Sequence, residues 1–136
     1  MRFMMLVYPG PGAEQGRMPD PEVLGRMMKF NEELAASGAL LDLNGLQPTS
    51  KGVRVSYSGG RPTVTDGPFT ESKELLGGYW MIKVGSLDEA VEWAKKAPMQ
   101  ADERIEVRQV FEMEDFAPEV RDEDAERRVA GALANA

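Results

Sequence analysis

Residues 63–84 read TVTDGPFTESKELLGGYWMIKV, and this stretch decides the fold. It begins and ends with β-branched and aromatic residues, which predicts a strand at each end. Between the strands, the DGPF tetrapeptide at residues 66–69 has turn chemistry: Asp bonds backbone amides, Gly accepts unusual dihedral angles, and Pro fixes the exit. The double glycine at residues 77–78 indicates a bulge or a close backbone approach. The stretch therefore predicts two strands separated by a turn and a charged segment.

On either side of this stretch, strands and helices alternate along the chain. The first helix has Asp20 in the N-cap position with Pro21 after it, and it ends at residues 37–38. A second helix opens with the capping box of residues 86–89 and ends before Pro98. The predicted strands cover, in order, residues 2–8, 39–46, 53–57, 62–65, 78–84 and 104–113.

This order of β-α-β, a hairpin, then β-α-β predicts an α+β protein of the ferredoxin-like type. We expect an antiparallel sheet with helices on one face, plus an extra hairpin that turns at residues 58–60 and that Pro62 places at a sheet edge. Residues 1–116 form this domain, and residues 117–136 form a loosely held, acidic and Ala-rich C-terminal tail, with one helix packing on a partner. Because the second sheet face lacks helices, we expect a homodimer that covers it.

The composition limits the function. The 136 residues carry a net charge of −7 and include no Cys and no His. The chain thus lacks the usual thiol nucleophile, general base and zinc ligands, and we expect no metal and no other cofactor. The acidic balance and the lack of a basic run exclude a nucleic-acid surface. The opening MRFMMLVY is too short for a signal peptide or a membrane span, so we expect a cytoplasmic protein with no membrane partner.

The sequence VTDGPFTESKELLGGYWMIKV closely resembles the signature of the DGPF branch of the YCII-related family. That signature is a strand ending in TDGPF, a polar E-x-K-E segment, then L-G-G-aromatic, and it falls here on Thr65 to Phe69, Glu71, Lys73, Glu74, Leu76, Gly77, Gly78 and Tyr79. The likeness runs from MRFMMLVY to IEVRQV at residues 105–110. The resemblance implies a dimeric α+β barrel with a cleft and no settled activity. Some family members are encoded beside extracytoplasmic-function sigma factors, which implies a regulatory partner of that class.

The resemblance also draws attention to a catalytic pair that is missing here. Related YCII proteins are proposed to use a His in the first helix and an Asp near its end. By ungapped alignment on Gly38, those positions are Met27 and Ala36. Any catalysis in this chain therefore needs another base. The proline that usually follows EVR in the family is Gln109 here, so the last strand departs from the family pattern.

Two aspartates are the candidate acid or base groups. Asp42 shares one strand face with Asn44, and if a partner covers that face its carboxylate needs a hydrogen bond or an ion partner, for which Arg108 is the candidate. Asp66 lies on the rigid turn, which aims it with the charged residues that follow into a cleft. The candidate ligand-binding residues are Tyr8, Asn44, Phe69, Glu71, Lys73, Tyr79 and Arg108. Structural roles are the alternative in each case: turn chemistry, an ion pair, or aromatic packing.

Three function classes follow from these residues. The first is a homodimer that binds a small polar or aromatic metabolite in a cleft near the TDGPF loop. The second is an enzyme that transfers protons in an isomerisation or elimination, with Asp42 or Asp66 as base and Arg108 or Lys73 steadying the anion. The third is a regulatory interaction protein that binds a partner through its dimer surface or its acidic tail. The polar cluster on an otherwise apolar sheet favours the first.

Overall fold

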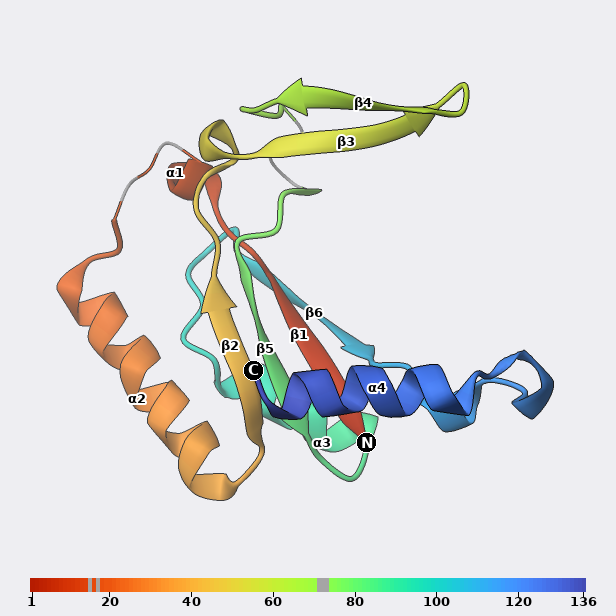
Figure 1. The fold of residues 1–136 in the computed structure, drawn as a ribbon. Helices are drawn as coiled ribbons and strands as arrows, with labels where there is room; N and C mark the ends of the chain where they lie inside the picture. The colour runs from red at the N-terminus through yellow and green to blue at the C-terminus, as the bar shows by residue number, and fades with distance from the viewer. Residues whose placement is uncertain (15, 17, 71–73) are drawn as a thin grey trace.

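The protein is built around a four-stranded antiparallel sheet. The computed structural model describes residues 1–14, 16, 18–70 and 74–136. The strands of the main sheet lie in the order β2-β5-β1-β6, with the bounds β2 (Leu40–Gly45), β5 (Gly78–Lys83), β1 (Arg2–Tyr8) and β6 (Arg104–Gln109) (Figure 1). The two βαβ halves place their first strands, β1 and β5, side by side at the centre. This is the ferredoxin-like order, so the predicted fold class is confirmed.

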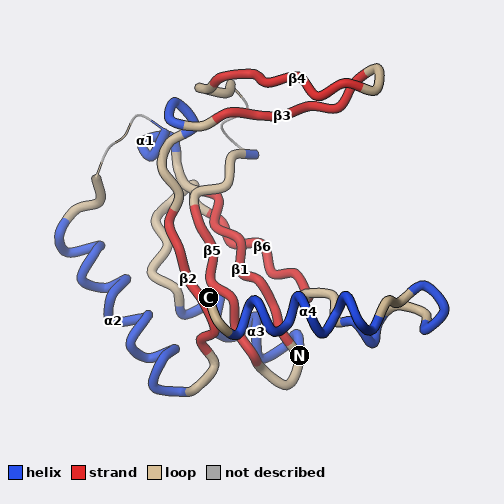
Figure 2. The backbone as a smooth tube through the Cα atoms, viewed as in Figure 1, coloured by secondary structure: helices blue, strands red, loops and turns tan. Residues whose placement is uncertain are grey.

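Two helices cover one face of the main sheet (Figure 2). Helix α2 (Pro21–Ser37) begins where the Asp20 carboxylate accepts a backbone N–H of the first turn, and it ends at Gly38, whose φ of 80° only glycine adopts freely. Helix α3 (Leu87–Lys96) begins where the Ser86 hydroxyl accepts a backbone N–H. Both starts lie where the capping signals predict them. Two single turns accompany the first βαβ half: α1 (Pro11–Glu14) lies between β1 and α2, and η1 (Thr49–Lys51) follows β2.

The hydrophobic core lies between the main sheet and these two helices. Its buried side chains come from both layers: Phe3, Met5, Phe30, Leu34, Trp80, Ile82 and Ala90. The rings of Phe30 and Trp80 meet edge to face with centroids 5.3 Å apart, a geometry that aromatic quadrupoles favour. Alternate residues of β1 and β5 therefore face the helices, as their positions along each strand predict.

The other face of the main sheet is not covered by α2 or α3, and we call it the open face. Its centre is apolar and half-buried, and consists of Met4, Leu6, Tyr8, Tyr79 and Met81. The edge strands bring polar side chains to the same face: Asp42, Asn44, Arg104, Glu106 and Arg108. The open face is thus an apolar stripe with polar borders.

The hairpin inserted after β2 forms a sheet of its own. Strands β3 (Val53–Ser58) and β4 (Arg61–Asp66) pair with each other, and every residue in them is exposed. Gly59 and Gly60 have φ angles of 64° and 79°, as a tight hairpin turn of this hand requires. The predicted hairpin is confirmed. Its expected place at an edge of the main sheet is wrong, because the hairpin projects beyond the end of that sheet (Figure 1).

Residues 112–136 form an extension that we call the C-terminal arm. It contains the turns η3 (Met113–Asp115) and η4 (Pro118–Val120) and the helix α4 (Glu123–Ala134), of which no residue is buried. The Arg2 guanidinium holds the start of the arm with two hydrogen bonds to Glu112, at 2.7 and 2.9 Å. Arg121 bonds Glu126 in the same two-pronged way, at 2.9 and 2.6 Å. The first pair ties the arm to β1, and the second folds the arm on itself.

Replacing Gly78 tests the packing of β5 against β2. A Cβ at Gly78 would lie 2.6 Å from the carbonyl oxygen of Asn44, so Gly78→Ala is expected to lower the free energy of unfolding by about 1–3 kcal/mol. Gly25→Ala is the matched control in α2, because its Cβ would meet nothing within 4 Å. The control should gain about 0.5–1 kcal/mol, since glycine disfavours helix interiors. Urea unfolding measures both values, and equal stabilities would contradict the close approach.

Acid is expected to loosen the C-terminal arm before the core unfolds. Hydrogen bonds from Arg2 lower the pKa of Glu112, and hydrogen bonds from Arg121 lower the pKa of Glu126, each from the usual 4.5. A carboxylate whose pKa is lowered on folding contributes its full stabilisation at a pH above its pKa in the unfolded chain. The stabilisation is lost as the pH falls through the pKa of the carboxylate in the folded chain. The protection factors of α4 amides against hydrogen exchange should therefore fall below pH 4.5, and less so in Glu126→Gln. Protection of α4 that persists until the core unfolds would refute this.

Candidate functional site

The TDGPF turn is fixed to the base of the hairpin through its backbone. Gly67 N donates to the carbonyl oxygen of Gly52 at 2.9 Å, and Phe69 N donates to Thr49 Oγ1 at 3.1 Å. A Cβ on Gly67 would lie 1.7 Å from the carbonyl oxygen of Thr49, so the turn needs glycine there. Thr49 also donates from its hydroxyl and its backbone N–H to the carboxylate of Glu14. The turn thus joins the hairpin to η1 and α1, which supports the structural account of this motif.

The side chains of the turn lie on or beside the hairpin. The guanidinium carbon of Arg54 lies 3.8 Å from the ring centroid of Phe69, so this ring packs on β3. Asp66 is exposed at the end of β4, in the separate sheet of the hairpin. The other two candidates in this region, Glu71 and Lys73, lie outside the described residues. The roles predicted for these four side chains stay predictions.

Three candidate residues, Asp42, Asn44 and Tyr79, form a hydrogen-bonded cluster on the open face. Tyr79 Oη donates to Asp42 Oδ2 at 2.6 Å, and Asn44 Nδ2 donates to Tyr79 Oη at 3.0 Å. Asp42 Oδ1 accepts the backbone N–H of Leu43 at 2.9 Å. The register of β2 and β5 places Asn44 opposite Tyr79. An irregularity between Leu40 and Asp42 places Asp42 opposite Met81. The two strands therefore bring a carboxylate, a carboxamide and a phenol together.

Arg108, the expected partner of Asp42, lies at the opposite edge of the main sheet. Strands β2 and β6 are the two ends of the strand order, which separates them by about 14 Å at the usual strand spacing. Arg108 Nη1 instead lies 3.9 Å from Glu106 Oε2 on its own strand. Neutral donors from Tyr79 and the backbone therefore satisfy the Asp42 carboxylate in place of an arginine.

Tyr8 lies on the open face in a separate group of side chains at the end of β1. The guanidinium carbon of Arg104 is 4.6 Å from the centroid of the Tyr8 ring. Arg104 Nη2 also lies 3.8 Å from Glu74 Oε1, in the segment that follows the TDGPF turn. Neither Arg104 nor Glu74 was predicted to bind a ligand, although Glu74 is part of the E-x-K-E pattern. The structure thus joins this pattern to the border of the open face.

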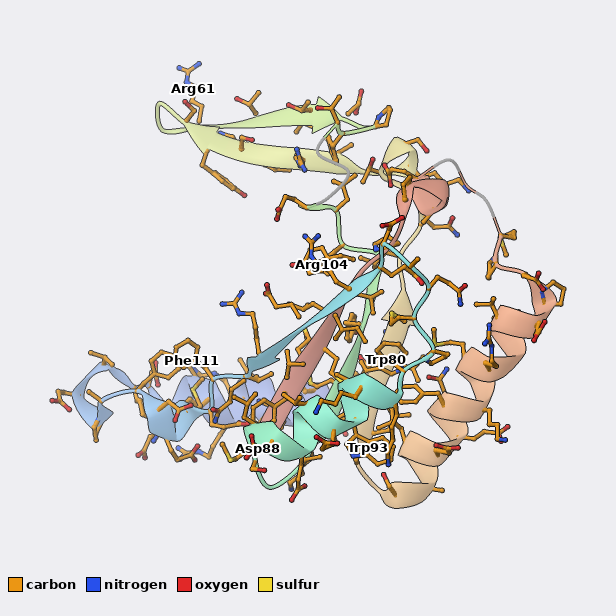
Figure 3. All side chains as sticks on the ribbon, turned by 180° about the vertical axis from the view of Figure 1, so that it is seen from behind. Arg61, Trp80, Asp88, Trp93, Arg104 and Phe111 are labelled. Atoms are coloured by element: carbon orange, nitrogen blue, oxygen red, sulfur yellow. The ribbon has the colours of Figure 1, made fainter. Side chains whose placement is uncertain are left out.

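A cavity of about 190 Å³ lies beside the cluster, where β2 and β5 meet α2, and we call it the α2 cavity. Val7, Leu43 and Trp80 contribute to its mainly apolar walls, and Asn44 and Tyr79 of the cluster also line it. Trp80 lies between the sheet and α2 (Figure 3). The cavity and the polar cluster are therefore neighbours that share two residues.

Two residues of α2, Met27 and Asn31, line this cavity and were not predicted as binding residues. Asn31 Oδ1 accepts the indole N–H of Trp80 at 2.8 Å, which fixes the carboxamide at the wall. A sequence signal existed, because Asn31 lies one turn after Met27 on the apolar side of an amphipathic helix. Met27 is also the position that the family likeness gives to the His. Ala36, the position given to the Asp, is exposed about 14 Å further along α2.

The polar side chains at or beside this site are a carboxylate, a phenol and two carboxamides, all of which can form hydrogen bonds. The carboxylate and the phenol can also exchange a proton. Within residues 1–14, 16, 18–70 and 74–136, no three His, Cys, Asp or Glu side chains gather so as to hold a metal ion. In the same part of the chain, every helix is too short or too polar to cross a bilayer.

Residues 1–114 match the family model of the YCII-related domain. The chain belongs to the YCII-related domain family. The resemblance seen in the sequence is thereby confirmed at the level of this family, and the DGPF branch stays a prediction. The match includes the main sheet and the hairpin and ends within the turn η3, so α4 lies beyond the family domain.

Two known proteins illustrate how far the similarity extends. The chain is 34% identical over 76 residues to Uncharacterized protein R00369 of Rhizobium meliloti (strain 1021), a match that covers 56% of this chain and 61% of the relative. A solved structure, 5-chloro-2-hydroxyhydroquinone dehydrochlorinase (TftG) from Burkholderia phenoliruptrix AC1100 in complex with 2,5-dihydroxybenzoquinone, is 16% identical, with a TM-score of 0.47. That comparison covers 86% of this chain and 100% of the other. Similarity at this level transfers neither an activity nor a ligand.

Removing the Tyr79 hydroxyl tests the cluster on the open face. Tyr79→Phe keeps the ring but takes one hydrogen-bond partner from Asp42 and one from Asn44, so we expect a loss of about 0.5–1.5 kcal/mol in the free energy of unfolding. Tyr57→Phe is the control, because Tyr57 is 81% exposed on the hairpin, and it should change stability by less than about 0.5 kcal/mol. If urea unfolding finds the two variants equally stable, water replaces the Tyr79 hydroxyl without loss.

Proposed function

We propose that this chain acts as a cytoplasmic homodimer that binds a small metabolite in the α2 cavity. The observation that carries the proposal is the cavity itself, whose volume is about 190 Å³. A cavity of roughly 150 Å³ accommodates a benzene ring. The ligand that fits is therefore a single-ring compound, or an aliphatic one of similar size, with one or two polar groups.

The lining of the cavity supports this ligand class. Binding sites for small molecules are usually apolar, with few polar groups that fix the orientation of the ligand. Here Val7, Met27 and Trp80 supply apolar surface, while Asn31 supplies a carboxamide. The bond between Asn31 and Trp80 orients one carboxamide before any ligand arrives, which reduces the entropy lost on binding. Glycines at positions 45, 77 and 78 leave backbone at the sheet end of the cavity.

The open face supports the homodimer. Met4, Leu6 and Met81 form an apolar stripe on the sheet face that α2 and α3 leave uncovered. Sheets bury such surfaces by packing face to face, about 10 Å apart. A second copy of the chain supplies this layer, and the family resemblance implies the same arrangement. No feature of the described residues singles out a sigma factor, so a regulatory partner rests on the family resemblance alone.

A second candidate function is acid–base catalysis at the polar cluster on the open face. The 2.6 Å hydrogen bond from Tyr79 Oη to Asp42 Oδ2 favours it, because a phenol and a carboxylate in contact form a path for a proton. In this reaction a substrate on the open face gives a proton to Tyr79 Oη, which passes its own proton to Asp42. The carboxamide of Asn44 on the same face stabilises the resulting anion. This version of the enzyme hypothesis uses Asp42 and leaves Asp66 without a catalytic role.

Native mass spectrometry of the purified full chain is the first test of this function. We expect a dimer of two 15.0 kDa chains that carries a small molecule released under denaturing conditions. A ligand recovered unchanged after incubation supports binding, whereas a ligand converted to a product supports catalysis. A monomer would contradict the assembly. For an empty dimer, thermal-shift screening of single-ring metabolites decides, and a complete lack of shifts would contradict the ligand class.

Filling the α2 cavity should abolish ligand binding without unfolding the protein. Met27→Trp adds a ring to the cavity wall, and we expect the affinity for the identified ligand to fall at least tenfold. Met28→Trp is the matched control, because Met28 is the next residue of α2, is 56% exposed and does not line the cavity. Isothermal titration measures both affinities, and circular dichroism confirms that both variants fold. Equal affinities in the two variants would place the ligand elsewhere.

A further inference from the structure

The hairpin has an apolar face that lacks cover from the described parts of this chain. The register places Val53, Val55, Tyr57, Pro62 and Val64 on one face of the two strands. Exposure of the three valines and the tyrosine ranges from 46% to 81%. A two-stranded hairpin is marginally stable alone in water, and an exposed apolar surface commonly marks an interaction site. The hairpin is therefore a surface that needs a partner.

The direction of this apolar face follows from its opposite side. Arg61 belongs to the polar face of the hairpin, together with Arg54 and Ser56. In Figure 3 the Arg61 side chain points away from the main sheet. The apolar face therefore points the other way, toward the space beside the main sheet.

The C-terminal arm has a second exposed apolar surface. A cavity of about 590 Å³ lies between α4, the turns before it and Arg2. Apolar side chains form most of its walls, and four of them, Phe116, Val120, Val129 and Leu133, are between 40% and 74% exposed. We call this surface the arm groove. Like the hairpin, the arm groove exposes large apolar side chains to water.

The charges of the hairpin and the arm are opposite. The hairpin, residues 53–66, contains two basic residues and one acidic residue, a net charge of +1. Residues 112–136 contain eight acidic and three basic residues, a net charge of −5, and the lining of the arm groove includes Asp122 and Glu126 beside Arg2 and Arg121. Opposite potentials favour contact between hairpin and arm, and like potentials disfavour contact between two hairpins or two arms.

The two surfaces lie at opposite ends of one chain and cannot meet within it. The arm is tied to Arg2 at the start of β1, whereas the hairpin lies beyond the end of β1 (Figure 1). The seven residues of β1 span about 20 Å. In a homodimer, the open face of a second copy can pack on the open face of the first. If the two-fold axis lies between the two sheets and perpendicular to the strands, the strands of the second copy run in the opposite direction to those of the first. Its hairpin then lies over the arm of the first chain, and the contact occurs twice by symmetry.

We propose that the hairpin of each chain docks in the arm groove of a second copy of this chain. The proposal rests on the homodimer of the proposed function and specifies how its two copies are oriented. Tyr57 and the valines of the apolar hairpin face enter the arm groove. Arg54 and Arg61 lie on the opposite, polar face of the hairpin, so their attraction to the acidic arm acts over a longer range and orients the two copies. Because the contact is reciprocal, it closes a dimer and does not extend into a fibre. The alternative axis, parallel to the strands, would bring together surfaces of like charge.

Cysteine cross-linking tests this docking in the full chain, which has no native Cys. The double variant Tyr57→Cys/Val129→Cys carries one thiol on the hairpin and one in the arm groove. With a short bismaleimide we expect a covalent dimer, in which peptide mapping joins positions 57 and 129. Each single variant should give no covalent dimer. The control Tyr57→Cys/Met28→Cys should give none either, because Met28 is exposed on α2, on the helix-covered side of the sheet.

The other outcomes separate the orientation from the homodimer itself. A dimer in native mass spectrometry that cross-links with Tyr57→Cys alone would show hairpin against hairpin and overturn the docking. A native dimer in which the double variant does not cross-link would also overturn it while leaving the homodimer intact. A native monomer would overturn the homodimer and the docking together. Val64→Cys, at a site 62% exposed, replaces Tyr57→Cys if circular dichroism shows that the first variant does not fold.

Discussion

The structure depends on the close backbone approach at the start of β5. Gly77 N donates to the carbonyl oxygen of Val7, and the carbonyl oxygen of Gly77 accepts from Leu46 N, both at 2.8 Å. A Cβ on Gly77 would lie 2.7 Å from the ring of Pro9, so no larger residue could occupy this position without displacing that ring. The double glycine thus lets one strand enter between two others. From that point, the register of β5 with β2 brings together the cluster of Asp42, Asn44 and Tyr79. The same two glycines also border the α2 cavity.

Most of the architecture could be predicted because its signals are local. Asp20 and Gly38 mark the ends of α2 through their own side-chain and backbone preferences, and the structure has both caps. The glycine pair at residues 59–60 likewise specifies the hairpin turn. Strand alternation correctly separates the core face from the open face. Each of these features depends on residues close together in the sequence, so one sequence is enough to predict it.

The features that could not be predicted depend on strand order, irregularities or contacts distant in sequence. The alternation of polar and apolar residues places Asp42 and Arg108 on two strands that each have one polar face. This pattern does not reveal that the two strands form opposite edges of the sheet. The last strand stops at Gln109, short of the predicted end, since Glu112 bonds Arg2 and caps η3. The α2 cavity forms only where three separate segments meet, so the sequence gives no direct signal for it.

In the proposed function, the polar cluster would connect assembly with ligand binding, because Asn44 and Tyr79 border the α2 cavity and their side chains lie on the open face. In a single chain, water competes for the bond between Tyr79 and Asp42 on this exposed face. In the proposed homodimer, a second sheet would cover the face and exclude this water, and hydrogen bonds in a drier environment are stronger. Asn44, which donates to Tyr79, would then be held more firmly beside the cavity. A ligand in the α2 cavity that contacts Asn44 would therefore bind the proposed dimer more tightly than the monomer, and by linkage it would stabilise the dimer by the same free energy.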